Sequence, residues 1–131
     1  MRMTDDIHEE DIMEFVLLIY QGSTPLPDTP EWASLSSDEQ KAVYADYAAL
    51  NGQAGLTPGL PLGLPETAKT VRVADGQAVV DDGPYGDNKS AVGGYFVLEA
   101  DDIDAAVAVA SRVPAARLGG GIEIRPVARY W

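Results

Sequence analysis

Residues 15–20 form one continuous apolar run, and this run constrains the fold more than any other segment. The run reads Phe-Val-Leu-Leu-Ile-Tyr. It is too short for a helix of ordinary length. A strand with one solvent-exposed face would alternate apolar and polar side chains. The run therefore predicts a strand that is covered on both faces.

Other segments also predict strands. Residues 67–73 and 77–80 flank Asp75-Gly76, a tight-turn signal, and should form a hairpin. Seven of the fourteen residues in 52–65 are Gly or Pro, which allows at best an irregular edge strand. The leucines in that segment nevertheless predict that it packs on the body. Two further strands are expected at 95–98 and 122–127.

Two segments have the apolar spacing of a helix. The first begins at Ser36, where Glu39 completes a capping box, and ends at Asn51-Gly52. The second begins at Asp101 or Asp102 and stops before Pro114. Their expected apolar stripes are Val43, Tyr47 and Leu50 in the first helix, and Ile103, Ala106, Val107 and Ala110 in the second. Residues 21–35 read as a loop that Trp32 and Leu35 pin to the body.

This order of elements favours the α+β class, with all strands in one antiparallel sheet and two helices on one face. Two helices cannot cover both faces of such a sheet. The apolar strands at 15–20 and 95–98 require cover on the second face as well. A second copy of the chain is the simplest cover, so we expect a homodimer.

Length and charge limit the remaining choices. The 131 residues suit one domain, placed at 14–131, behind an acidic segment 1–13 that reads as a solvated tail or a frayed helical arm. The net charge of −12 argues against nucleic acid and against anionic membrane surfaces as partners. Cysteine is absent, which excludes disulfides and thiolate catalysis. No apolar run reaches 18 residues, and the acidic start does not fit a secretion signal, so we expect a cytoplasmic protein.

The densest polar cluster spans residues 81–89, Asp-Asp-Gly-Pro-Tyr-Gly-Asp-Asn-Lys. It reads either as ordinary turn chemistry or as a site, and its spacing does not fit an EF-hand. Arg72 and Arg125 lie on predicted strands and could bind a carboxylate, although such arginines more often pair with neighbours such as Glu123.

Two other features give little support for a functional site. His8 is the one histidine and lies in the acidic tail, so no metal site is expected and a Ser-His-Asp triad is disfavoured. Gly119-Gly120-Gly121 precedes a predicted strand, whereas phosphate-binding loops precede helices. We therefore expect no phosphate site there and no cofactor.

Several stretches, in this order, resemble the YCII-related superfamily in its DGPF-domain branch. They are residues 16–20, 67–73, 82–85, Lys89 with 93–96, 113–117 and 123–127. The resemblance implies a ferredoxin-like fold that pairs into a dimeric α/β barrel, in a bacterial protein of mostly unassigned activity. This chain departs from the family in having Tyr85 for Phe and Asp-Asn-Lys-Ser at 87–90 for Glu-Thr-Lys-Glu. Because no histidine lies in the body, the His–Asp pair proposed for some members cannot be carried over.

Two functions remain open from the sequence. The first is a homodimeric accessory or ligand-binding module that recognises a small molecule. The second is a small cofactor-independent enzyme in which Asp82, with its pKa raised by burial, is the acid or base. Tyr85 and Lys89 would then position the substrate and neutralise charge, and the first function is slightly preferred.

Overall fold

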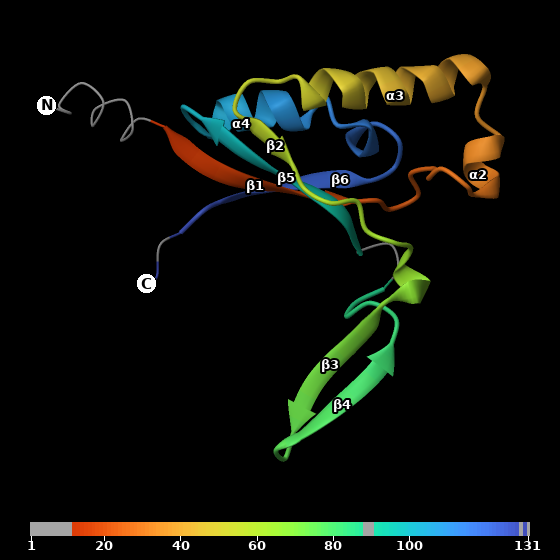
Figure 1. Cartoon of the computed structure of the whole chain (residues 1–131), viewed down its shortest axis with the longest axis vertical. Helices are drawn as coiled ribbons and strands as arrows, with labels where there is room; N and C mark the ends of the chain where they lie inside the picture. Colours follow the sequence, from red (N-terminus) through yellow and green to blue (C-terminus); the bar gives the residue numbers. More distant parts are fainter. Residues whose placement is uncertain (1–11, 88–90, 129, 131) are drawn as a thin grey trace, which may run out of the picture.

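The main sheet of the protein has four antiparallel strands in the order β2-β5-β1-β6. The computed structural model describes residues 12–87, 91–128 and 130. The strands of the main sheet are β1 (Met13–Tyr20), β2 (Leu56–Pro58), β5 (Val92–Ala100) and β6 (Gly121–Pro126). The helices are α2 (Pro30–Ala33), α3 (Ser37–Asn51) and α4 (Ile103–Ala110), with 3-10 turns η1 (Pro65–Thr67) and η3 (Pro114–Ala116). The α+β class and the antiparallel pairing are confirmed (Figure 1).

Strand β1 is a central strand, as its apolar run predicts. It pairs with β5 along one edge and with β6 along the other, so its backbone groups bond within the sheet. Phe15 and Leu17 are fully buried and Ile19 nearly so, whereas Val16 and Leu18 between them are half-buried. Successive side chains of a strand point to opposite faces. One face of β1 therefore belongs to the core and the other remains partly open.

Helices α3 and α4 cover one face of the main sheet (Figure 1). The core between them is built mainly from β1, β5 and these helices, and its buried members are Phe15, Leu17, Ile19, Leu50, Leu56, Phe96, Leu98, Ala106, Val109, Ala110, Val113 and Ala115. The predicted capping box is present at the start of α3. Ser36 Oγ accepts from the Glu39 amide at 3.1 Å, and a Glu39 carboxylate oxygen accepts from the Ser36 amide at 2.8 Å. The backbone N–H of Ser36 thereby lowers the pKa of Glu39.

Two helix predictions need correction. The predicted loop 21–35 contains the one-turn helix α2, which Thr29 caps and whose Trp32 is buried. The Trp32 ring meets Tyr44 of α3 edge-on at a centroid distance of 5.4 Å. In α4 the buried stripe includes Val109, while Ile103 and Val107 are about half exposed. The predicted stripe and the observed one share Ala106 and Ala110, and both fit helical spacing, so the spacing alone could not distinguish them.

The predicted hairpin is present but does not join the main sheet. Strands β3 (Lys69–Ala74) and β4 (Gln77–Asp82) form a separate two-stranded sheet. Asp75 and Gly76 both have positive φ, at 51° and 76°, as a type I′ turn requires. We call residues 69–82 the arm. Figure 1 shows that the arm projects from the body on the side of the main sheet opposite α3 and α4.

Most of the acidic segment 1–13, including His8, lies outside the described residues. The same holds for Lys89 and for residues 88 and 90 beside it. The first described strand, β1, begins at Met13. Within the described ranges, none of the helices has the length and apolar character needed to cross a membrane.

Candidate functional site

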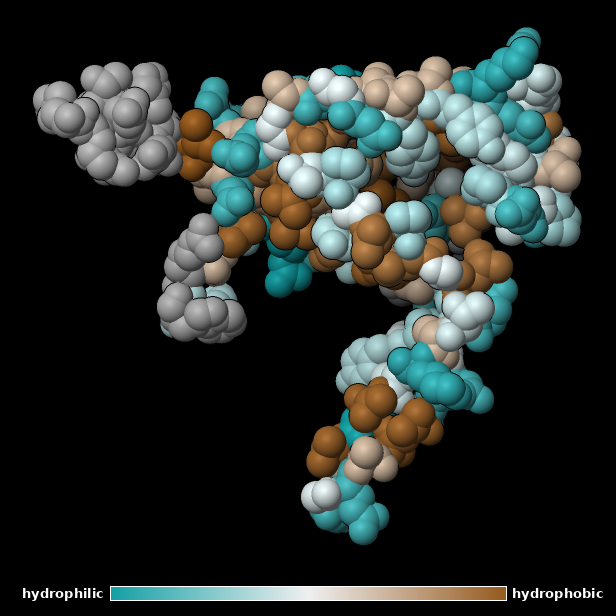
Figure 2. Space-filling model, in the orientation of Figure 1, coloured by the Kyte–Doolittle hydropathy of each residue, from teal (hydrophilic) through white to brown (hydrophobic). Residues whose placement is uncertain are grey.

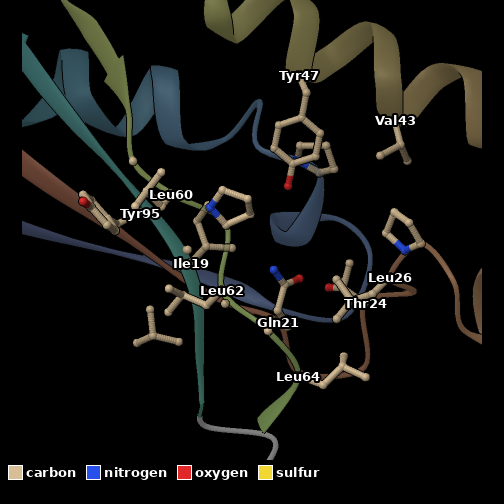
Figure 3. Close-up of a pocket in the computed structure, with 18 of the residues that line it drawn as sticks. Ile19, Gln21, Thr24, Leu26, Val43, Tyr47, Leu60, Leu62, Leu64 and Tyr95 are labelled. Atoms are coloured by element: carbon tan, nitrogen blue, oxygen red, sulfur yellow. The ribbon is translucent and has the colours of Figure 1, made fainter. Parts of the chain in front are cut away.

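A pocket of about 730 Å³ lies at the end of the main sheet beside α3. Figure 3 shows its three walls: Val43 and Tyr47 descend from α3, Ile19 comes from β1, and Leu60, Leu62 and Leu64 come from the chain after β2. Trp32 of α2 and the loop around Leu26 close the remaining side. The lining is mostly apolar, so the pocket favours apolar groups over ions.

The leucine wall is the Gly/Pro-rich segment of the sequence. After β2 ends, the Gly59 amide donates to the Tyr95 carbonyl at 2.9 Å and the Leu62 amide donates to the Gly93 carbonyl at 3.0 Å. The segment therefore follows the edge of β5 without forming a regular strand, as its prolines require. Leu60 is 73% exposed and Leu62 is 50% exposed. The irregular edge is confirmed, but the prediction that the leucines pack on the body holds only for Leu56, which is buried, since Leu60, Leu62 and Leu64 are exposed and line the pocket.

Tyr47, Gln21 and Thr24 are among the polar residues that line this apolar space. The Tyr47 hydroxyl points into the cavity toward the Gln21 amide (Figure 3). Burial raises the pKa of Tyr47, so the phenol remains protonated at neutral pH. The hydroxyl of Thr24 is buried and has no hydrogen-bond partner among the described residues. A buried hydroxyl without a partner is costly, but this oxygen lies beneath the surface that a ligand in the pocket would touch.

The side chain of Gln21 has room because residue 93 is a glycine. A Cβ atom at Gly93 would overlap the side chain of Gln21, so the amide lies directly over the β5 backbone. Any larger residue at position 93 would displace Gln21 from the pocket. Gly93 therefore leaves the space that a polar group of the site occupies.

The pocket lining is nearly free of charge. Among its described residues, Asp28 is the one carboxylate, and the lining includes no Lys, Arg or His. Asp28 is exposed, and it lies with positive φ at 67° in the loop before α2. An anionic ligand would find no cation among the described lining residues and would meet a chain of net charge −12.

The site residues expected from the sequence lie elsewhere. Asp82 ends β4 with its side chain 85% exposed, at 2.5 Å from Lys69 Nζ, so the burial expected for this carboxylate is absent. Arg72 bonds Asp81 at 3.1 Å on the same arm, and Tyr85 is 82% exposed. None of these side chains lines the pocket. The structure brings Asp82 and Arg72 together with partners on the arm, and their roles toward a ligand stay predictions.

Arg125 lies on β6 in the main sheet. Its guanidinium donates to Glu123 at 2.9 Å, which is the ordinary pairing considered from the sequence. This partner raises the pKa of Arg125. Gly119 and Gly120 make a close backbone contact with the chain that follows β1, in which the Ser23 amide donates to the Gly119 carbonyl at 3.1 Å. Across the described ranges, no group of three His, Cys, Asp or Glu side chains is placed to hold a metal ion.

The substitution Asp82→Asn should change the free energy of unfolding by less than about 1 kcal/mol. Exposed ion pairs contribute little, because water and salt screen both charges. Thermal unfolding of the variant beside the original protein measures the change. A loss of several kcal/mol would contradict this exposed placement and show that Asp82 is buried in the protein in solution.

Sequence reasoning missed the pocket residues. It assigned Tyr47 to the apolar stripe of the first helix and gave no role to Gln21 or Thr24. One signal was present: a tyrosine within a core stripe needs a partner for its hydroxyl. Gln21 and Thr24 follow β1 in an irregular segment, where residue spacing does not indicate the direction in which a side chain points.

The sequence matches the YCII-related domain over residues 13–130. It is also similar to an uncharacterized protein of Rhizobium meliloti (strain 1021). The two are 29% identical over 123 residues, which cover 90% of this chain and 94% of that protein. The matched range includes the main sheet, the pocket and the arm.

Proposed function

Since the chain belongs to the YCII-related domain family, we propose that it is a homodimeric module that binds a small neutral molecule in the pocket beside α3. The observation that carries the proposal is an apolar pocket of about 730 Å³ whose lining includes the polar groups of Tyr47 and Gln21, with the Tyr47 hydroxyl pointing into it. Small-molecule sites have this size and this composition, with a few polar groups that orient the ligand.

The chemistry of the lining defines the class of ligand. Apolar walls from Ile19, Val43 and the three leucines favour a compact hydrocarbon or aromatic body. Gln21 can donate and accept hydrogen bonds, and the Tyr47 phenol can do the same. A neutral ligand with one carbonyl, hydroxyl or amide group at its end would fit both features.

Binding is favoured over acid–base catalysis. General acid–base chemistry needs a group whose pKa lies near the working pH, within hydrogen-bond reach of the substrate. In the described pocket the protonated Tyr47 phenol lies too far from that range, and Asp82 lies on the arm. The geometry therefore supports recognition without chemistry.

The fold supports the finer part of the proposal. The strand order β2-β5-β1-β6, with α3 and α4 over one face, supports a ferredoxin-like arrangement. The half-open second face supports pairing of two copies into a dimeric α/β barrel. The segment Asp82-Gly83-Pro84-Tyr85 supports membership in the DGPF-domain branch.

The substitution Leu62→Asp should weaken binding of the neutral fluorescent probe N-phenyl-1-naphthylamine at least about tenfold. A carboxylate in the leucine wall would have to be desolvated when an apolar probe enters. Fluorescence titration measures the affinity. The matched control is Val107→Asp on α4, since Val107 and Leu62 are each 50% exposed and Val107 lies outside the pocket.

Equal affinities for the original protein and Leu62→Asp would contradict the assignment of the pocket. An equal loss in Val107→Asp would show that the probe binds exposed apolar surface in general. Tyr47→Phe is the second variant, because it keeps the apolar wall and removes one polar group. It should leave the affinity for this apolar probe within about threefold.

A further inference from the structure

The arm carries an apolar face that its own chain leaves exposed. Val71 pairs with Val80 and Val73 pairs with Ala78, so all four side chains lie on one face of the hairpin. The three valines are 61%, 56% and 72% exposed, in the order 71, 80 and 73. Figure 2 shows these apolar side chains gathered along the arm, away from the body.

A two-stranded hairpin of this kind is marginally stable alone in water, because it buries one thin face at most. The arm forms a sheet separate from the main one, and its base is joined by the Gly83 amide donating to the Ala68 carbonyl at 2.8 Å. Ion pairs at its base are exposed and add little. The regular strands and the matched valine pairs therefore indicate a surface that is covered when the protein is assembled.

A second apolar surface lies on the same side of the molecule. The open face of the main sheet presents Val16 and Leu18 of β1 beside Tyr95 and Val97 of β5, which pair with them. The arm projects on this side of the sheet, opposite α3 and α4 (Figure 1). The arm and the open face therefore lie on the same side of the main sheet.

The area of these surfaces fits one kind of partner. A stable interface buries roughly 800 Å² on each partner. The open face of four strands covers roughly 400 Å², since strands lie about 4.8 Å apart and rise about 3.3 Å per residue. The open face alone therefore supplies about half of what a stable pair needs, and the exposed valine face of the arm is a further apolar surface.

We propose that the arm of each copy packs its valine face on a second copy of this chain, which is seated on the open face of the main sheet. This inference rests on the homodimer of the proposed function and names the element that completes it. A second copy suits the site because a two-fold axis lets both apolar surfaces of each copy be covered at once. Two chains of net charge −12 repel each other, so apolar contact must hold the pair together and salt should strengthen it.

The test is sedimentation equilibrium of the full chain and two arm variants. The first is the double variant Val71→Ser/Val80→Ser, and its control is Val79→Ser on the opposite face of the same arm. The second variant replaces residues 71–80 with Asn-Gly, which keeps the paired residues Thr70 and Asp81 and suits a two-residue hairpin turn. Each arm variant should raise the dimer dissociation constant at least tenfold, and the control should change it less than threefold.

The outcomes separate this inference from the proposed function. An original protein that stays monomeric would overturn both the homodimer and the arm contact, while probe binding in the pocket would still be measured separately. A dimer whose dissociation constant is unchanged in both arm variants would overturn the arm contact alone. A dimer that dissociates as salt is added would also overturn it, because that dependence indicates attraction between opposite charges.

Discussion

Leu17→Ala should lower the free energy of unfolding by about 3 kcal/mol, within a range of roughly 2–5 kcal/mol for buried leucines. Leu17 is fully buried in the middle of β1, between Phe96 of β5 and Ile124 of β6. Removing its side chain leaves a cavity that the sheet and helices cannot close. Thermal unfolding should show the melting temperature fall by roughly 10 °C.

Leu18→Ala is the matched control for this prediction. It removes the same atoms from the adjacent residue, whose side chain lies half-buried on the open face. We expect less than half of the loss seen for Leu17→Ala when the protein is dilute. If two copies pair through this face, the loss in Leu18→Ala should grow with protein concentration, because only the original protein gains from association. Equal losses for the two variants at all concentrations would contradict the two-faced description of β1.

Gly120→Ala should destabilise the protein by about 3 kcal/mol, at the upper end of what overpacking costs. A Cβ atom at this position would overlap the carbonyl oxygen of Tyr20 and lie 2.7 Å from that of Gln21. Both are backbone atoms, which cannot rotate aside as a flexible side chain would. The chain after β1 must therefore shift, and it carries Gln21 and Thr24 into the pocket. Binding of the neutral probe should weaken together with stability.

Gly121→Ala provides the control one residue further along. A Cβ atom there would meet nothing within 4 Å. Urea unfolding and probe titration should give values close to those of the original protein. A tolerated Gly120→Ala, or a harmful Gly121→Ala, would show that the contact between the two loops differs from the one described.

Much of the local structure could be predicted from the sequence because neighbouring residues decide it. The run at 15–20 needs no distant partner to be recognised as a strand, although one of its two faces stays partly open in the structure. The capping box of Ser36 and Glu39 and the turn at Asp75-Gly76 are also set within a few residues. The sequence also indicated the family through several short segments in a fixed order. The main sheet, its class and the long helix α3 follow from these signals.

The candidate site could not be predicted in this way. Tyr47, Gln21 and Leu62 belong to three segments that are far apart in the sequence, and their convergence depends on how α3 sits over the sheet. The polar cluster 81–89 suggested a functional site because acidic, aromatic and basic residues lie close together along the chain. In the structure Asp81 and Asp82 pair with Arg72 and Lys69 across the hairpin, which uses their charges within the arm.

The sequence by itself determined which segments become strands and helices, since periodicity, caps and turns act over a few residues. Only the tertiary structure decided where the hairpin goes. Alternation in residues 69–82 specifies two paired strands equally well at the edge of a sheet or apart from it. Their attachment through the Gly/Pro-rich segment carries them off the edge of β5, so that the arm stands apart and its valines remain exposed. Burial is a property of what lies nearby in space, and sequence spacing does not contain it.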